Sequence, residues 1–169
     1  YGDAGKFFWD QSLGPEYLYY FSFDDDLIYP STYILDTLPA LQKYDGQAIV
    51  SYHGRIMKAQ PIKQYYRDHF WRHNCLAEYA GPIKQIQVPG SGVAAWDRRR
   101  FMVNYDKINL ANMGDIWLAK FAGERDLPIY LLPHPWDYFT YQNPPTTIYD
   151  KNRADSSVQA NLFNEVLTL

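Results

Sequence analysis

An aromatic and apolar run near the start of the chain ends abruptly in three consecutive aspartates. Residues 17–23, with the sequence YLYYFSF, predict a short buried strand, and Asp24, Asp25 and Asp26 follow it directly. Two carboxylates about 4 Å apart repel each other by about 4 kcal/mol at an effective dielectric constant of about 20. Mg²⁺ and Mn²⁺ prefer oxygen ligands and remove that repulsion. The triplet therefore indicates either a divalent metal site at a strand end or an acidic, solvated turn that caps the next helix.

Strand and helix patterns alternate along the rest of the chain, which predicts an α/β fold. Further strands are expected at 48–52, at 83–88 with a continuation at 93–96, and at 129–132. Helices are expected at 31–44, 64–75, 98–103, 112–125 and 156–167, and residues 140–153 are expected to form a loop. Pro39 should kink or split the first of these helices. Asp155 or Ser156 should cap the last helix, whose buried face would comprise Val158, Leu162, Phe163 and Val166.

Size and composition exclude several classes of protein. A chain of 169 residues fits one domain, and its hydrophobic fraction of 47 % argues against disorder. The 16 basic and 19 acidic residues give a net charge of −3, which argues against an electrostatic nucleic-acid binder. No stretch approaches the ~20 apolar residues of a transmembrane segment. Aromatic residues make up 18 % of the chain, and such side chains stack on sugars as well as fill a core.

Several stretches, in order, resemble the GT-A fold glycosyltransferases that use an Asp-x-Asp motif. The strand, DDD and then LIYPSTY, at residues 17–33, is similar to that motif. GDAGKFF at residues 2–8 resembles a segment that borders the nucleotide, and SYHG at residues 51–54 resembles the following strand and its turn. GSGVAAW at 90–96, followed by NMGDIWLAKFA at 112–122, resembles the acceptor-side loop and the helix with the catalytic base. The subgroup in question builds bacterial surface polysaccharides and some viral capsid glycans.

The resemblance implies a GT-A-like mixed sheet flanked by helices, in a single glycosyltransferase domain spanning residues 1–169. Such proteins begin with a nucleotide-binding βαβ portion, and one βαβ unit needs about 30 residues or more. Only residues 1–16 precede the first predicted strand. We therefore expect the upstream, nucleotide-binding portion to be missing, so that this chain is the metal-binding and acceptor half of a larger domain. The resemblance also implies a cytoplasmic protein, in the host cytoplasm if the source is viral.

The resemblance assigns the aspartates to the donor and its metal. Asp26 would ligate Mn²⁺ or Mg²⁺, Asp24 would lie near the ribose or a metal-bound water, and Asp25 could share either role. His134, in LLPHPW directly after a predicted strand, would be a further metal ligand, the alternative being a loop histidine without that role. His69 and His73 also have the spacing of ligands on a helix, but no third ligand is evident.

Two residues of the GDAGK segment are further candidates for donor binding. Lys6 would neutralise a phosphate of the donor, and Asp3 would contact its base or ribose. The alternative for both is an ordinary surface charge.

The catalytic base in this interpretation is Asp115, which opens the helix predicted at 112–125. An inverting transfer needs a carboxylate to take the proton from the acceptor hydroxyl. The alternative is an acid favoured there by the helix macrodipole, which would also lower its pKa and weaken it as a base. Asp97, which follows the Gly90–Gly92 loop closely, is the second candidate base.

The acceptor would be a glycan or glycoprotein, and its contacts are assigned to the second half of the chain and one strand end. The candidate acceptor-binding residues are His53, Gly90, Ser91, Gly92 and Trp117. Trp96 could join Trp117 in stacking against a sugar, although a core role is the default for both. Arg98, Arg99 and Arg100 could attract an anionic group, the alternative being a solvated helix face.

The sequence thus predicts a metal-dependent glycosyltransferase. It would move a sugar from a UDP- or GDP-linked donor to a glycan hydroxyl, with inversion at the anomeric carbon. Two other classes stay open: a non-catalytic, metal-assisted carbohydrate-binding module and a metal-dependent phosphohydrolase.

Overall fold

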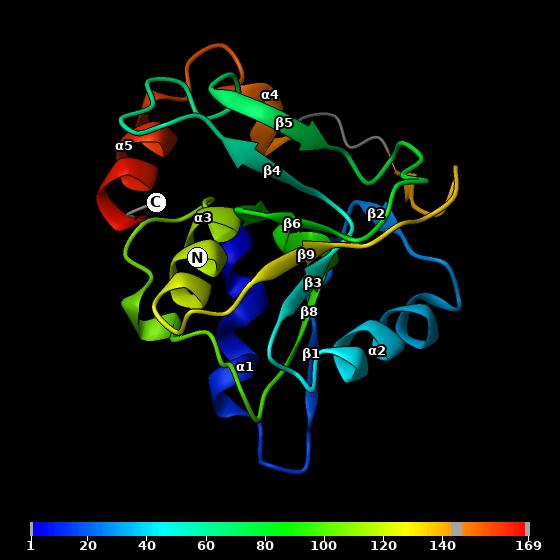
Figure 1. Cartoon of the computed structure of the whole chain (residues 1–169). Coiled ribbons are helices and arrows are strands. Elements are labelled where there is room, and N and C mark those ends of the chain that lie inside the picture. Colours follow the sequence, from blue (N-terminus) through cyan, green and yellow to red (C-terminus); the bar gives the residue numbers. More distant parts are fainter. Residues whose placement is uncertain (1, 143–146, 168–169) are drawn as a thin grey trace.

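The computed structural model describes residues 2–142 and 147–167 and has a mixed α/β architecture (Figure 1). A five-stranded sheet in the order β1-β8-β3-β9-β6 lies at its centre. Its strands are β1 (Tyr19–Phe21), β3 (Ile49–Ser51), β6 (Lys84–Ile86), β8 (Ala94–Asp97) and β9 (Ile129–Leu131). β3 and β9 run parallel, whereas the other neighbours are antiparallel. The predicted α/β class with a mixed sheet and flanking helices is confirmed.

Both faces of the central sheet are covered by helices. Successive side chains of a strand point to opposite faces, so neighbouring residues of one strand enter different cores. On β3, Ile49 packs into one core with α3 (Gly114–Gly123) and α5 (Ser157–Val166), and Val50 packs into a second core with α2 (Tyr33–Lys43). Figure 1 shows α2 on one side of the sheet and α3 on the other. The N-terminal elements η1, a 3₁₀ helix (Gly2–Phe7), and α1 (Phe8–Ser12) lie on the α3 side.

Two smaller sheets accompany the central one. An antiparallel sheet in the order β5-β4-β7 consists of β4 (Gly54–Met57), β5 (His69–His73) and β7 (Val88–Pro89). β2 (Leu27–Ile28) pairs with β10 (Thr140–Tyr141). The remaining short elements are the 3₁₀ helices η2 (Ser91–Val93) and η3 (Tyr105–Lys107) and the helix α4 (Ile148–Asn152).

Most predicted elements are present, but four expectations need correction. The strand predicted at 17–23 is shorter and only half-buried, because β1 lies at an edge of the sheet. Helix α2 continues through Pro39 as a single helix, so of the two predicted effects of Pro39 the split does not occur. The expected loop 140–153 contains β10 and α4, with residues 143–146 outside the described part. On α5, Val158 is exposed, so the buried face is instead formed by Gln159, Ala160, Leu162 and Phe163.

Two predicted helices are wrong. Within 64–75 the chain forms β5, where burial alternates residue by residue as expected for an aromatic-containing strand. Residues 98–103 form a turn followed by extended chain, because tertiary hydrogen bonds fix this segment. The guanidinium of Arg98 pairs with Asp10 at 3.0 Å and also donates to the carbonyl oxygens of Leu13, Gly14 and Tyr17. Arg98 is therefore a buried structural residue.

Candidate functional site

Segments that are far apart in the sequence meet at one place beside the central sheet. η1 supplies Lys6, whose Nζ forms an ion pair with Oδ1 of Asp24, in the loop that follows β1. The same loop touches η2, since a Cβ added to Gly92 would lie only 1.8 Å from Oδ2 of Asp24. Only a glycine at position 92 leaves room for that carboxylate. The structure thus brings together the predicted residues Lys6, Asp24 and Gly92.

Tyr29 locks the aspartate loop against η2. Its hydroxyl accepts a hydrogen bond from the backbone N–H of Asp24 at 2.7 Å and donates one to the carbonyl oxygen of Gly92. The short apolar stretch after the aspartates places Tyr29 there, through the pairing of β2 with β10. One side chain therefore fixes the distance between the predicted donor and acceptor loops.

Asp115, the predicted base, contacts η2 at Ser91, the residue before Gly92. Its Oδ1 accepts a hydrogen bond from the N–H of Ser91 at 2.7 Å, and its side chain is half-buried in the first turn of α3. The neighbouring N–H of Gly114 donates to Oδ2 of Asp3 at 2.9 Å. A Cβ on Gly114 would lie 2.9 Å from the same Asp3 oxygen. The helix start is therefore joined to η1 and to η2.

The part of the site around Lys6 contains more acidic than basic side chains. Burial raises the pKa of Asp3; the N–H of Gly114 and then Lys6 act against this, and the charges of Asp115 and Asp24 raise it further. Burial also raises the pKa of Asp26, and Asp24 and Asp25 add to this, so the triplet repels itself as predicted. Tyr141 hydrogen-bonds to Asp26, whereas Asp25 is exposed. Such a site attracts a cation.

The described part of the chain does not contain a preformed metal site made of protein side chains alone. Across residues 2–142 and 147–167, no three His, Cys, Asp or Glu side chains are grouped so that they could bind a metal ion. Mg²⁺ commonly uses one or two carboxylates together with substrate phosphates. Asp24 and Asp26, whose charges act on each other, could supply that pair of carboxylates.

Three buried polar atoms without a hydrogen-bond partner belong to residues around Asp115. They are Oδ1 of Asp3, Nε of Arg55 and the hydroxyl oxygen of Tyr65. Arg55 lies 4.6 Å from the ring centroid of Tyr65, and Asp115 and Asp3 both act on the pKa of Tyr65. Buried polar groups normally have partners, so orphans at one place suggest a ligand.

His53 is influenced by both an acidic and a basic residue of the site. Burial lowers the pKa of His53 to about 4, with a further lowering by Arg55 and an opposing effect of Asp115. His53 is therefore neutral near pH 7. Its carbonyl oxygen accepts from the N–H of Gly90 at 2.7 Å, and a Cβ on Gly90 would lie 2.6 Å from the Cβ of His53. The predicted residues His53 and Gly90 are in direct contact.

Other predicted residues lie elsewhere. The Nε2 atoms of His134 and His73 are 2.9 Å apart, and the Nδ1 of His134 is 3.2 Å from the carbonyl oxygen of Pro135, so both ring nitrogens of His134 have protein partners. No contact joins His134 to the aspartate triplet in the described part of the chain. His69 lies at the other end of the same strand as His73, not on a helix as predicted.

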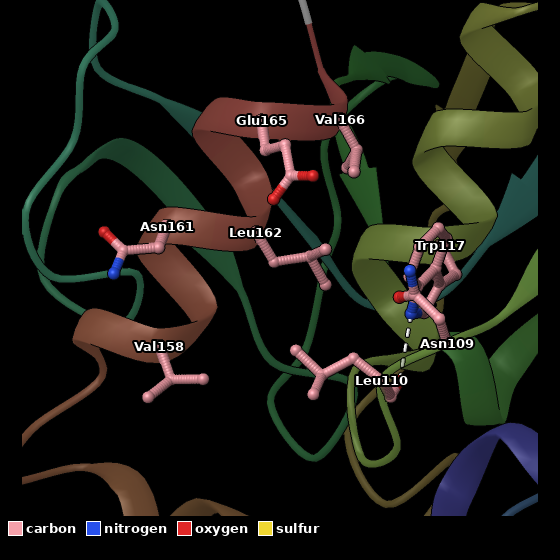
Figure 2. A pocket seen from close by; sticks show the side chains of 8 residues that line it. All are labelled: Asn109, Leu110, Trp117, Val158, Asn161, Leu162, Glu165 and Val166. Atoms are coloured by element: carbon pink, nitrogen blue, oxygen red, sulfur yellow. Dashed lines mark hydrogen bonds between the residues drawn. The ribbon is translucent and has the colours of Figure 1, made fainter.

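The two tryptophans are also in other surroundings. Trp96 is fully buried and donates to Asp10, so it has no free face for a sugar. Trp117 is only 3 % exposed and donates to the carbonyl oxygen of Leu110 (Figure 2). It lines a pocket of about 240 Å³ between α3 and α5. That pocket shares no residue with the site around Asp115; it is lined by Asn109, Leu110, Trp117, Val158, Asn161, Leu162, Glu165 and Val166.

Asp97, the second candidate base, is held by its own neighbours. Burial acts to raise the pKa of Asp97, but hydrogen bonds from Arg99 and the charges of Arg99 and Arg100 lower it overall. Oδ1 accepts from the N–H of Arg99 at 2.9 Å. A carboxylate stabilised in this way is a poor proton acceptor, which leaves Asp115 as the better candidate.

Sequence reasoning missed Arg55, Tyr29 and Tyr65 as site residues. The one available signal was a charged residue, Arg55, directly after the SYHG stretch.

The sequence matches no known protein family and no curated protein. The helices of the described residues include none with the length and apolar character needed to cross a membrane.

Proposed function

We propose that this chain is a metal-dependent glycosyltransferase of the GT-A type. The observation that carries the proposal is the meeting of Lys6, Asp24, Gly92 and Asp115. These residues come from motifs chosen for their likeness to such enzymes, and they are up to 109 residues apart in sequence.

On the donor side, Asp24 and Asp26 would hold Mn²⁺ or Mg²⁺ together with the diphosphate of a UDP- or GDP-sugar. A bound cation of this kind neutralises the charge that develops on a diphosphate leaving group. Lys6 already lies against Asp24 and could turn to a phosphate oxygen. Asp3, half-buried beside Lys6, would contact the ribose or base.

On the acceptor side, Asp115 would take the proton from the attacking hydroxyl of a glycan. The N–H of Ser91 fixes the Asp115 carboxylate at 2.7 Å, so the base is held in one orientation against η2. Gly90 and Gly92 let the backbone of this loop come close to a sugar. A positioned carboxylate base typically contributes 10²–10⁴-fold to the rate.

Thermal shift and transfer assays on two variants test this proposal. UDP at about 100 times its dissociation constant should stabilise the protein by about 2.7 kcal/mol, and only with Mn²⁺ present. Asp26→Asn should abolish that response. Asp115→Asn should keep it while sugar transfer falls by at least 10²-fold. Asp106→Asn, an exposed acid on η3, is the matched control and should change neither.

Other outcomes would assign the site to another class. Stabilisation by a glycan alone, with no response to nucleotide, would favour a carbohydrate-binding module. Phosphate release without an acceptor would favour a phosphohydrolase. Normal transfer by Asp115→Asn would remove Asp115 as the base.

A further inference from the structure

Arg55 is a buried arginine whose guanidinium has no anionic partner within the described residues. Arg55 lies on β4, the central strand of the β5-β4-β7 sheet, and only 7 % of its surface is exposed. Its Nε has no hydrogen-bond partner, and no hydrogen bond or ion pair joins its guanidinium to any residue within 2–142 or 147–167. Its contacts are aromatic, with the rings of Tyr65 at 4.6 Å and Tyr66 at 5.5 Å.

Arg98 shows how this protein treats a buried arginine that has a structural role. Arg98 is also 7 % exposed, but its guanidinium forms an ion pair with Asp10 and donates to several carbonyl oxygens. A buried charge is costly unless it is paired and hydrogen-bonded. Contact with aromatic rings does not satisfy the N–H donors of Arg55. The Nε donor of Arg55, which is buried without a hydrogen-bond partner, is therefore an unexplained cost if the protein acts alone.

The surroundings of Arg55 add positive charge and further unused polar atoms. Arg72, on β5, is the directly paired residue, so both arginines lie on the same face of the small sheet. Like charges in opposite positions destabilise a strand pair. The hydroxyl of Tyr65 is also buried without a partner. The nearby acids are Asp115 and Asp3, which both act on Tyr65 and Tyr66, but neither forms an ion pair with Arg55.

We propose that Arg55, together with Arg72, binds an anionic group of the acceptor, either a carboxylate or a phosphate on the sugar. The identification of the bound group as part of an acceptor rests on the proposed function, whereas the anion site itself does not. A guanidinium offers a planar fork of N–H donors that matches two oxygens of such a group. Tyr65 and Tyr66 would hold that fork in place, and Asp115 would lie beside the sugar that carries the anion.

Direct binding measurements test the site without relying on transfer. Glucuronate and glucose, which differ by the carboxylate, are titrated by calorimetry into the wild-type protein, and inorganic phosphate is the second anionic probe. We expect binding of glucuronate or of phosphate and at least tenfold weaker binding of glucose. Arg55→Met should lose at least tenfold in anion affinity. Arg125→Met, at an exposed arginine that donates to the carbonyl oxygen of Met102, is the control and should bind as the wild type does.

Arg55→Lys keeps the charge and provides a second test if the methionine variant does not fold. It should bind anions more weakly than the wild type, because an ammonium lacks the two-pronged geometry. Unchanged anion affinity in both variants, or equal binding of glucose and glucuronate, would overturn the proposal. The donor is tested separately, since Arg55→Met should keep the response to Mn²⁺ and UDP. Loss of that response on Arg55→Met would instead place Arg55 on the donor diphosphate.

The two proposals can fail separately. Anion binding that requires Arg55, in a protein that never responds to Mn²⁺ and UDP, would keep the anion site and reject the transferase. A response to Mn²⁺ and UDP without any anion binding would keep the transferase proposal and reject the anion site.

Discussion

Replacing Gly92 with alanine should break the contact on which the candidate site depends. The new Cβ would lie 1.8 Å from Oδ2 and 2.0 Å from Cγ of Asp24, whereas ordinary contact begins at 3.4 Å. The backbone N–H of Asp24 is held by Tyr29, so the carboxylate itself must swing away by about 1.6 Å. The ion pair of Asp24 with Lys6 is then lost.

The cost of that loss follows from the burial of the pair. The side chain of Lys6 is 13 % exposed and that of Asp24 is 37 % exposed. Exposed pairs contribute about 0–1 kcal/mol, and breaking buried pairs costs about 3–5 kcal/mol. We therefore expect Gly92→Ala to lower the free energy of unfolding by about 2 kcal/mol, which lowers the melting temperature by roughly 4–8 °C for a chain of this size.

Gly123→Ala is the matched control, because nothing lies within 4 Å of a Cβ at that position. Gly123 ends α3, and alanine there should raise stability by about 0.5–1 kcal/mol. Urea unfolding followed by circular dichroism measures both changes, and a thermal shift with Mn²⁺ and UDP measures binding. Only Gly92→Ala should lose the binding response. An unchanged unfolding midpoint and an unchanged response in Gly92→Ala would refute the reasoning.

Two further predictions concern parts of the structure outside the site. Arg98→Met should lower the free energy of unfolding by about 3–5 kcal/mol, because it leaves the buried carboxylate of Asp10 without its ion-pair partner. Arg100→Met, at an exposed ion pair, is the control and should change it by less than about 1 kcal/mol. Urea unfolding measures both changes. Burial and then the charge of His134 lower the pKa of His73 to about 4 from its ordinary 6.5. The unfolded state then binds a proton between these pH values that the folded state does not, so stability should fall by up to about 3 kcal/mol as the pH drops from 6.5 to 4. His73→Gln should flatten this pH dependence in urea unfolding, and an unchanged slope would contradict the assignment.

The fold class could be predicted because strands and helices leave local patterns in the sequence. Strands such as β3 and β9 are short apolar runs, and α3 has apolar residues on most of its surface with Asp115 in its first turn. The contact of Gly92 with Asp24 and that of Ser91 with Asp115 are seen only in the structure.

The remaining errors arise where tertiary contacts override local pattern. Residues 98–103 look helical, but Arg98 finds its partners in residues 10–17, which no local pattern indicates. The segment 64–75 was predicted to be a helix because its polar and aromatic residues are distributed around one, yet pairing with β4 makes it a strand. Arg55 was missed because a strand arginine is normally expected at the surface, and its burial depends on Tyr65 and Tyr66.

The hydroxyl of Tyr29 has a mechanical consequence. The hydroxyl of Tyr29 accepts a hydrogen bond from the backbone of Asp24 and donates one to the backbone of Gly92. Neither segment can therefore shift without breaking one of these bonds. A displacement of Asp24 should therefore also move Gly92 and the neighbouring amide of Ser91. That amide donates to the carboxylate of Asp115, so the position of Asp115 should change as well. The hydroxyl of Tyr29 thereby couples the position of Asp24 to that of Gly92, two residues of the candidate site that are far apart along the chain.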